Sequence, residues 1–130
     1  KIESEGLSDR VDFVAGDYHR DSFPAGHDLA LLSAVIHINS PEANRSLYSR
    51  LLRAMVSGGT ILIRDFFLDE TRTKPAQGAI FAVNMLVATT AGNSYTVKEV
   101  FEDLVSCGFI EPRLAIDGPN MEQVIMATRP

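Results

Sequence analysis

Short apolar runs alternate with an amphipathic stretch between residues 28 and 67 of the chain. Asp28–Val35 is a nearly continuous apolar run, which predicts a strand buried on both faces of a sheet. Ser40 followed by Pro41 is typical of a helix start, with serine as the cap and proline at the first helical position. The predicted helix then places its large apolar residues on one face: Leu47, Leu51, Leu52 and Met55.

A second apolar strand follows this helix. Gly58 and Gly59 are expected to end the helix, and Thr60–Phe67 is expected to form the strand. Strand–helix–strand alternation predicts a parallel α/β sheet, in which ligands bind outside the carboxyl ends of the strands. His37 and Asp65 both fall where those ends are predicted, so any chemistry is expected there.

Further elements flank this central unit. Arg10–Ala15 alternates in polarity and predicts a short strand. Gly78–Thr90 is apolar and almost uncharged, and its length favours a buried helix over a strand. Thr96 and Glu99 form a capping-box pattern that predicts another helix, which Gly108 would end.

The chain ends in two predicted strands, Ile110–Ile116 and Glu122–Thr128, joined by an Asp-Gly-Pro-Asn turn. These two strands are expected to form an antiparallel hairpin. The whole order predicts an α/β fold that corresponds to the second half of a doubly wound domain. A mainly parallel sheet that closes with a reversed hairpin resembles the class I methyltransferase fold, which is Rossmann-like.

Composition and charge exclude several other classes of protein. The chain has 130 residues, of which 45% are hydrophobic and 22% charged, so it is one globular domain or less. Its net charge of -5, without a Lys/Arg cluster, argues against a nucleic-acid partner. No run approaches the roughly 18 apolar residues of a membrane span. The single cysteine, Cys107, cannot form an internal disulfide, which fits a reducing, cytoplasmic location. No metal site is expected, because the histidine spacing matches no known ligand pattern.

Several segments, in order, resemble one family. Arg10–Tyr18 (RVDFVAGDY) is similar to a family segment with Gly-Asp before an aromatic residue, and Leu31–His37 (LLSAVIH) to a family strand that ends in histidine. Leu51–Phe66 is similar to the stretch that follows, and Asn84–Leu86 and Gly108–Phe109 to its tail. Together these segments resemble the S-adenosylmethionine-dependent small-molecule O-methyltransferases of the plant caffeate and acetylserotonin type and their bacterial relatives.

This resemblance implies three residues on the cofactor side. Asp17 and Tyr18 match positions that flank the adenine of S-adenosylmethionine, where a carboxylate accepts from the exocyclic amine and an aromatic ring covers the base. Ser33 matches a position near the cofactor that is lysine in the plant enzymes and often small and polar in bacterial ones. The implied cofactor is therefore S-adenosyl-L-methionine.

The resemblance also implies residues on the acceptor side. His37 matches the catalytic base that takes the proton of the acceptor hydroxyl, a task that suits a neutral imidazole at physiological pH. Asp65 matches the acidic residue that orients this base, while Asn84 and Met85 match positions that line the acceptor pocket. The implied reaction is methyl transfer to a hydroxyl of a small aromatic, carotenoid or polyketide-like acceptor.

Several family features are absent or altered. The glycine-rich cofactor loop, the ribose-binding acidic residue, the first two strands and the helical dimerisation domain have no counterpart here. The usual Asp-Trp after the base is Ile38–Asn39, and a second acidic residue near the base aligns with Ser94. We therefore expect the 130 residues to be the C-terminal part of a methyltransferase catalytic domain, inactive alone, whose open strand edge at Leu29–Val35 favours a homodimer.

Two alternatives stay open from the sequence. A non-catalytic Rossmann-like domain could keep the fold and bind a ligand without turnover, which Ile38 and Ser94 favour. Half of another nucleotide-binding α/β enzyme, such as a dehydrogenase, would also show strand–helix alternation, but the reversed hairpin at the end favours a methyltransferase.

Overall fold

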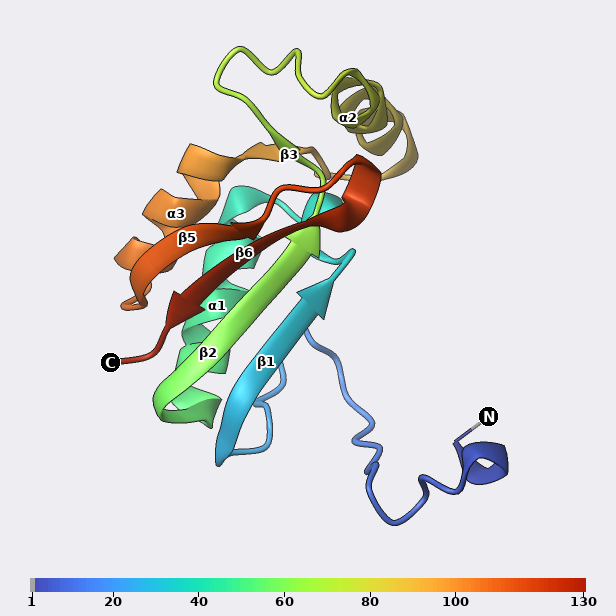
Figure 1. Cartoon of the computed structure of the whole chain (residues 1–130), viewed down its shortest axis with the longest axis vertical. Helices are drawn as coiled ribbons and strands as arrows, with labels where there is room; N and C mark the ends of the chain where they lie inside the picture. Colours follow the sequence, from blue (N-terminus) through green and yellow to red (C-terminus); the bar gives the residue numbers. More distant parts are fainter. Residues whose placement is uncertain (1) are drawn as a thin grey trace.

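A mixed four-stranded sheet lies at the centre of the computed structural model, which describes residues 2–130 (Figure 1). Its strands are β1 (His27–Ser33), β2 (Met55–Asp65), β5 (Ile110–Ile116) and β6 (Gln123–Thr128), in the order β1-β2-β6-β5. β1 runs parallel to β2, whereas β6 runs antiparallel to both β2 and β5. The predicted parallel unit and the predicted C-terminal hairpin are both confirmed. The prediction of a mainly parallel sheet is wrong for residues 2–130, because the hairpin pairs with β2 and makes two of the three strand pairs of this sheet antiparallel.

Helix α1 (Pro41–Ala54) connects β1 to β2 and begins as predicted. The Ser40 hydroxyl oxygen accepts a hydrogen bond from the backbone N–H of Ala43 at 3.2 Å. The predicted stop at Gly58 is wrong, because the helix ends at Ala54 and Met55 already has an extended backbone. Met55 is buried and pairs with His27 of β1, so packing and strand pairing draw the chain out of the helix before the glycines.

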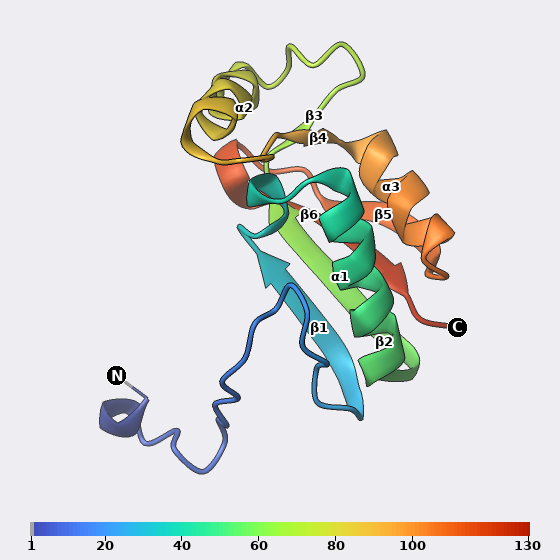
Figure 2. The ribbon, with the colours of Figure 1, turned by 180° about the vertical axis from the view of Figure 1, so that it is seen from behind.

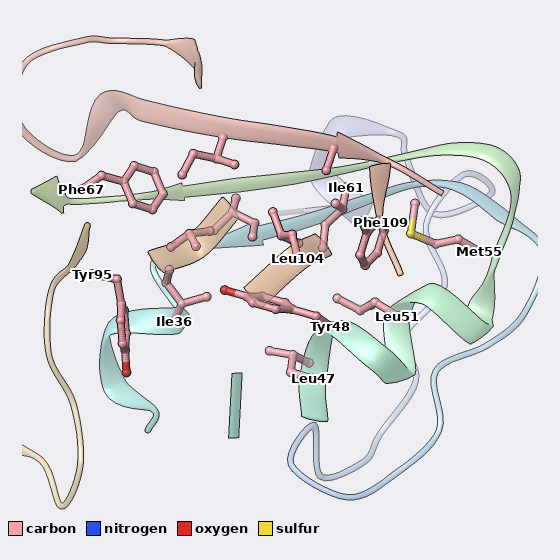
Figure 3. Close-up of a cluster of buried hydrophobic side chains, with 14 residues drawn as sticks. Ile36, Leu47, Tyr48, Leu51, Met55, Ile61, Phe67, Tyr95, Leu104 and Phe109 are labelled. Atoms are coloured by element: carbon pink, nitrogen blue, oxygen red, sulfur yellow. The ribbon is translucent and has the colours of Figure 1, made fainter. Parts of the chain in front are cut away.

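Helices α1 and α3 (Val97–Ser106) cover one face of the sheet (Figures 1 and 2). The core lies between them and the sheet, and Figure 3 shows Tyr48 of α1 near Leu104 of α3. Ile61 and Ile63 of β2 alternate with partly exposed residues, which is the period expected of a strand with one covered face. The capping box of α3 is present as predicted.

Helix α2 (Ala76–Ala88) lies beyond the carboxyl ends of β1 and β2 (Figure 1). Its helical state confirms the sequence-based expectation, but the expectation that it is buried is wrong. Within α2 only Gly78 is buried, and four large side chains are 60–83% exposed: Ile80, Val83, Leu86 and Val87. The physical reason is its position at the end of the sheet, where its main contacts are with short elements near residues 36–38, 67–68 and 120–122. None of the helices in residues 2–130 has the length and apolarity needed to cross a membrane.

Short elements complete the described part of the chain. The two-residue strands β3 (Phe67–Leu68) and β4 (Tyr95–Thr96) pair in parallel, a small sheet that the sequence did not predict. Three single-turn 3₁₀ helices are also present: η1 (Glu3–Glu5), η2 (Ile36–Ile38) and η3 (Asn120–Glu122).

The strand predicted at Arg10–Ala15 is absent. This segment has no partner strand within residues 2–130 and trails away from the sheet (Figures 1 and 2). Phe13 and Val14 are 82% and 70% exposed. Alternating polarity alone does not produce a strand, because its backbone groups need a neighbouring strand with which to pair.

β1 differs from the prediction because one of its two faces is exposed. A strand buried on both faces was expected, yet Leu29 and Leu31 are 54% and 60% exposed. They alternate with Ala30 and Leu32, which pack against the core beneath α1. Among residues 2–130, no helix covers the opposite face, and β1 has a paired strand on one side only.

Candidate active site

His37 and Asp65 meet at the carboxyl edge of the parallel strand pair. β1 ends at Ser33, and Ala34 turns the chain with a positive φ of 57° while its N–H donates to the Arg64 carbonyl at 2.9 Å. The chain then enters η2, which carries His37, while Asp65 is the last residue of β2. Because parallel strands end at the same edge, the two residues lie side by side, as the sequence predicted.

The imidazole and the carboxylate form a buried pair. His37 Nδ1 lies 2.8 Å from Asp65 Oδ1 and 3.0 Å from Oδ2. The side chains are only 10% and 1% exposed, respectively. An ionised carboxylate can only accept hydrogen bonds, so Nδ1 carries the hydrogen of the neutral ring. This tautomer makes Nε2 the nitrogen with a lone pair, which is the form that a general base needs.

Two aromatic rings lie beside this pair. The ring of Phe81 on α2 meets the His37 ring edge-to-face, with centroids 4.8 Å apart at 85°. Phe66, directly after Asp65, lies 4.9 Å from the same Phe81 ring. Asn84 and Met85 follow Phe81 by three and four residues, so helical spacing puts all three on one side of α2.

A groove lies next to this site. A groove of about 380 Å³ separates the C-terminal part of α2 from the start of α1. Its floor includes Asn93, whose N–H donates to the His37 carbonyl at 2.9 Å. Neither Asn84 nor Met85 lines this groove, so the structure does not bring the two predicted acceptor residues into it.

Asp17 lies at the start of a tight polar turn. Its Oδ1 accepts from the backbone N–H of His19 at 2.9 Å and its Oδ2 from Arg20 Nε at 2.7 Å. The backbone N–H of His19, together with Arg20, lowers the pKa of Asp17, which keeps this carboxylate ionised. Asp17 and Tyr18 both line a small cavity of about 140 Å³ formed by residues 14–18 and 21–24.

A buried arginine holds this turn against α1. Arg50 is 9% exposed, and its Nη2 and Nη1 donate to the carbonyls of Tyr18 and Asp21 at 2.7 Å and 3.4 Å. Its guanidinium also lies over the ring of Phe23, 5.8 Å from the centroid. The Asp17–Phe23 segment, which contains no helix or strand, is therefore anchored by a side chain.

The two serines that the sequence singled out have other partners. Ser33 is exposed at the carboxyl end of β1, where its hydroxyl oxygen accepts from Arg64 Nη1 at 3.2 Å. Ser94 is fully buried, and its hydroxyl donates to the Gly78 carbonyl at 3.2 Å. Asp65 is therefore the carboxylate that contacts the His37 ring in the described part of the chain.

Several residues around the site were not predicted. Asn39 and Asn44 form buried hydrogen bonds behind His37, and Arg50 and Phe81 contact the two halves of the site. A signal existed for Asn44, because it shares the apolar face of α1 with Leu47 and Leu51 at helical spacing. A polar residue on such a face needs a buried partner.

Comparisons with known proteins bear on the family and the fold of this chain. The sequence profile of an O-methyltransferase domain matches residues 1–110. The chain is 36% identical over 113 residues to 3-hydroxy-5-methyl-1-naphthoate 3-O-methyltransferase of Streptomyces sahachiroi, an alignment that covers 87% of this chain and 32% of the relative.

Solved structures agree with the sequence comparison. A putative O-methyltransferase from Nostoc punctiforme superposes with a TM-score of 0.91 at 25% identity, over 97% of this chain and 39% of that one. Human N-acetylserotonin methyltransferase, solved in complex with S-adenosylmethionine, gives a TM-score of 0.85 at 29% identity, over 94% of this chain and 34% of that one.

These observations define a class of protein: an α/β chain with a mixed sheet and a buried histidine–carboxylate pair at its strand ends. Within that class, the chain belongs to the O-methyltransferase domain family. It spans about a third of the length of the curated relatives it matches.

Replacement of Arg50 by methionine is expected to release the Asp17–Phe23 segment from α1. Methionine keeps the apolar stem but removes the donors to two carbonyls, so backbone amides in this segment should exchange hydrogen faster. The free energy of unfolding should fall by about 2 kcal/mol, the size of a lost hydrogen bond to a charged group.

Arg53→Met is the matched control, because Arg53 lies on the same helix and is exposed. Hydrogen exchange followed by mass spectrometry checks both variants. Equal acceleration of exchange in the two variants would show that Arg50 is not the anchor.

Proposed function

We propose that this chain is part of an S-adenosylmethionine-dependent O-methyltransferase that acts on a hydroxyl of a small aromatic, carotenoid or polyketide-like acceptor, with His37 as the general base. The observation that carries this proposal is the buried His37–Asp65 pair at the ends of β1 and β2 in a chain of the O-methyltransferase domain family. The named relatives include a naphthoate 3-O-methyltransferase, which supports an aromatic acceptor.

The protein has to remove the proton of the acceptor hydroxyl and to orient the base that takes it. S-adenosylmethionine, when bound, supplies an activated methyl group on a sulfonium sulfur. Nε2 of His37 accepts the proton of the acceptor hydroxyl, while Nδ1 keeps its own hydrogen and donates it in a hydrogen bond to Asp65. The Asp65 carboxylate holds the ring in this tautomer and stabilises the imidazolium that forms. Phe81 and Phe66 form an apolar wall beside the ring, against which an aromatic acceptor can lie.

Residues near the amino-terminal end of the described chain fit the cofactor. The ionised Asp17 carboxylate can accept a hydrogen bond from an exocyclic amine, and the Tyr18 ring offers a flat apolar surface. Both line one small cavity, and Ser33 lies at the carboxyl edge of the sheet. A solved relative of the same fold that holds S-adenosylmethionine supports this assignment.

We also infer that the chain is the C-terminal part of a class I, Rossmann-like catalytic domain. Its sheet leaves one face of β1 uncovered, with Leu29 and Leu31 more than half exposed. An apolar face of this kind is typical of a sheet that another layer covers. The relatives' greater length supports the presence of that layer in the whole protein.

In the whole protein, His37→Ala should lower turnover on a hydroxyl acceptor by about 100-fold or more, the usual contribution of a general base. The dissociation constant for S-adenosylhomocysteine should change little, because His37 faces the acceptor. Initial rates and calorimetry measure the two quantities. His27→Ala is the control, since His27 is exposed at the opposite end of β1. Turnover near that of the unmodified protein would refute the base and favour a domain that binds without catalysis.

Asp17→Ala should have the opposite pattern. Loss of the carboxylate removes a proposed partner of the adenine amine, so S-adenosylhomocysteine should bind about 10-fold more weakly, the effect of one hydrogen bond to a charged group. Turnover at saturating cofactor should change much less. Asp12→Ala, at an exposed position in the preceding segment, serves as the control in the same titration. An unchanged dissociation constant would remove Asp17 from the cofactor site.

We further propose that the 130-residue chain self-associates through β1. Its free edge and the exposed Leu29 and Leu31 offer backbone pairing and apolar surface to a second copy. Sedimentation velocity should show a dimer or larger assembly, and Leu31→Lys should shift it toward monomer. Val105→Lys on α3, at a position that is 55% exposed, should leave the distribution unchanged. A monodisperse monomer for the unmodified chain would contradict this proposal.

A further inference from the structure

A chain of buried amide groups lies directly behind the turn that carries His37. Nδ2 of Asn44, in the first turn of α1, donates to the carbonyl of Ile36 at 3.0 Å. Nδ2 of Asn39 donates to Oδ1 of Asn44 at the same distance. Asn39 and Asn44 are only 4% and 2% exposed, respectively, so water does not compete for these bonds. The carbonyl at the end of this chain belongs to the residue just before His37.

Two tyrosines donate hydrogen bonds to Asn39 of this amide chain. The Tyr18 hydroxyl donates to Oδ1 of Asn39 at 3.3 Å, and the Tyr95 hydroxyl donates to the Asn39 carbonyl. Burial raises the pKa of Tyr95 to about 12, and desolvation also raises that of Tyr18, so both hydroxyls stay protonated donors. The hydrogen bonds therefore run in one direction, from Tyr18 through two amides to η2.

The backbone of His37 is held on its other side as well. The N–H of Asn93 donates to the His37 carbonyl at 2.9 Å. A Cβ at Gly92 would come within 2.4 Å of the same carbonyl oxygen, so the two backbones touch without space between them. The turn of His37 is thus clamped between the amide chain and the loop that contains Gly92.

The two amides stabilise the turn, because an apolar residue in place of Asn44 would leave the buried Ile36 carbonyl without this donor. They also give the turn a direction, because each amide has one accepting and one donating end. They define one orientation of the turn, and that orientation places Nδ1 of His37 on Asp65.

We propose that Asn39 and Asn44 are positioning residues for the His37 base and that they join it to Tyr18 on the cofactor side of the site. This inference rests on the proposed function, because it gives His37 a catalytic role. Neither asparagine touches the reacting atoms. Both act by keeping the backbone of η2 in the position from which His37 reaches Asp65 and the acceptor.

A double-mutant cycle in the whole protein tests this inference. Asn44→Leu keeps a similar volume but removes the donor to Ile36, and it should lower kcat by about 10-fold through a displaced base. The dissociation constant for S-adenosylhomocysteine should stay within about 2-fold, which also shows that the variant is folded. When His37 is already alanine, the same change should lower kcat by less than about 2-fold, because residues that act through one group are not additive.

Thr96→Ala is the control, since it removes the cap of α3 and destabilises the protein without contact to the amide chain. It should leave kcat unchanged in both backgrounds. If Asn44→Leu does not bind S-adenosylhomocysteine, Asn39→Ser takes its place in the cycle. The same losses of kcat in the two backgrounds are then expected of Asn39→Ser.

The outcomes separate two failures. Unchanged kcat in Asn44→Leu, or an equal loss in both backgrounds, overturns the positioning role while His37→Ala still shows its large defect. If His37→Ala itself retains turnover, the proposed function fails first, and the positioning role that depends on it fails too.

Discussion

The in-register parallel pairing of β1 with β2 is the constraint on which the site depends. Ser33 pairs with Arg64, so η2 leaves one strand beside the point where Asp65 ends the next. A slip of two residues would move Asp65 by about 6.6 Å along the strand, which is beyond the reach of a hydrogen bond. The alternation of Ile61 and Ile63 toward the core opposes a slip of one residue, because that slip would expose both side chains.

Helix α1 organises both halves of the site from one face. Near its start, Asn44 reaches the carbonyl before His37, and later in the helix Arg50 reaches the carbonyl of Tyr18. The Asp17–Phe23 segment has no strand or helix of its own, so side-chain donors supply the backbone partners that secondary structure would otherwise provide. The proposed base and the proposed cofactor residues are therefore placed by the same rigid element.

One face of the sheet is uncovered in this chain, and the relatives that it matches are longer. β1 packs Ala30 and Leu32 toward α1 but exposes Leu29 and Leu31, and α2 exposes most of its apolar residues. A strand that pairs in parallel ordinarily has both faces covered. The chain spans about a third of the curated relatives' length, so the activity proposed above is a proposal about the whole protein.

The sequence by itself determined the elements whose signals are local. Apolar periodicity, the Ser40 cap and the Thr96–Glu99 capping box predicted β1, α1, β2, α2 and α3, and the polar turn after Ile116 predicted the hairpin of β5 and β6. It also placed His37 and Asp65 at strand ends, because that position follows from where each apolar run stops. The early end of α1 at Ala54 escaped this approach, since the burial of Met55 outweighed the nearby glycines.

Only the tertiary structure decided which groups meet across long stretches of sequence. The alternation at Arg10–Ala15 resembled a strand, but no neighbouring strand in residues 2–130 pairs with it. The carbonyl partners of Asn44 and Arg50 and the ring contact of Phe81 depend on how α1, α2 and the loops pack. Local patterns record backbone preference and the period of burial, whereas a hydrogen-bond partner far along the chain is set by the packed fold alone.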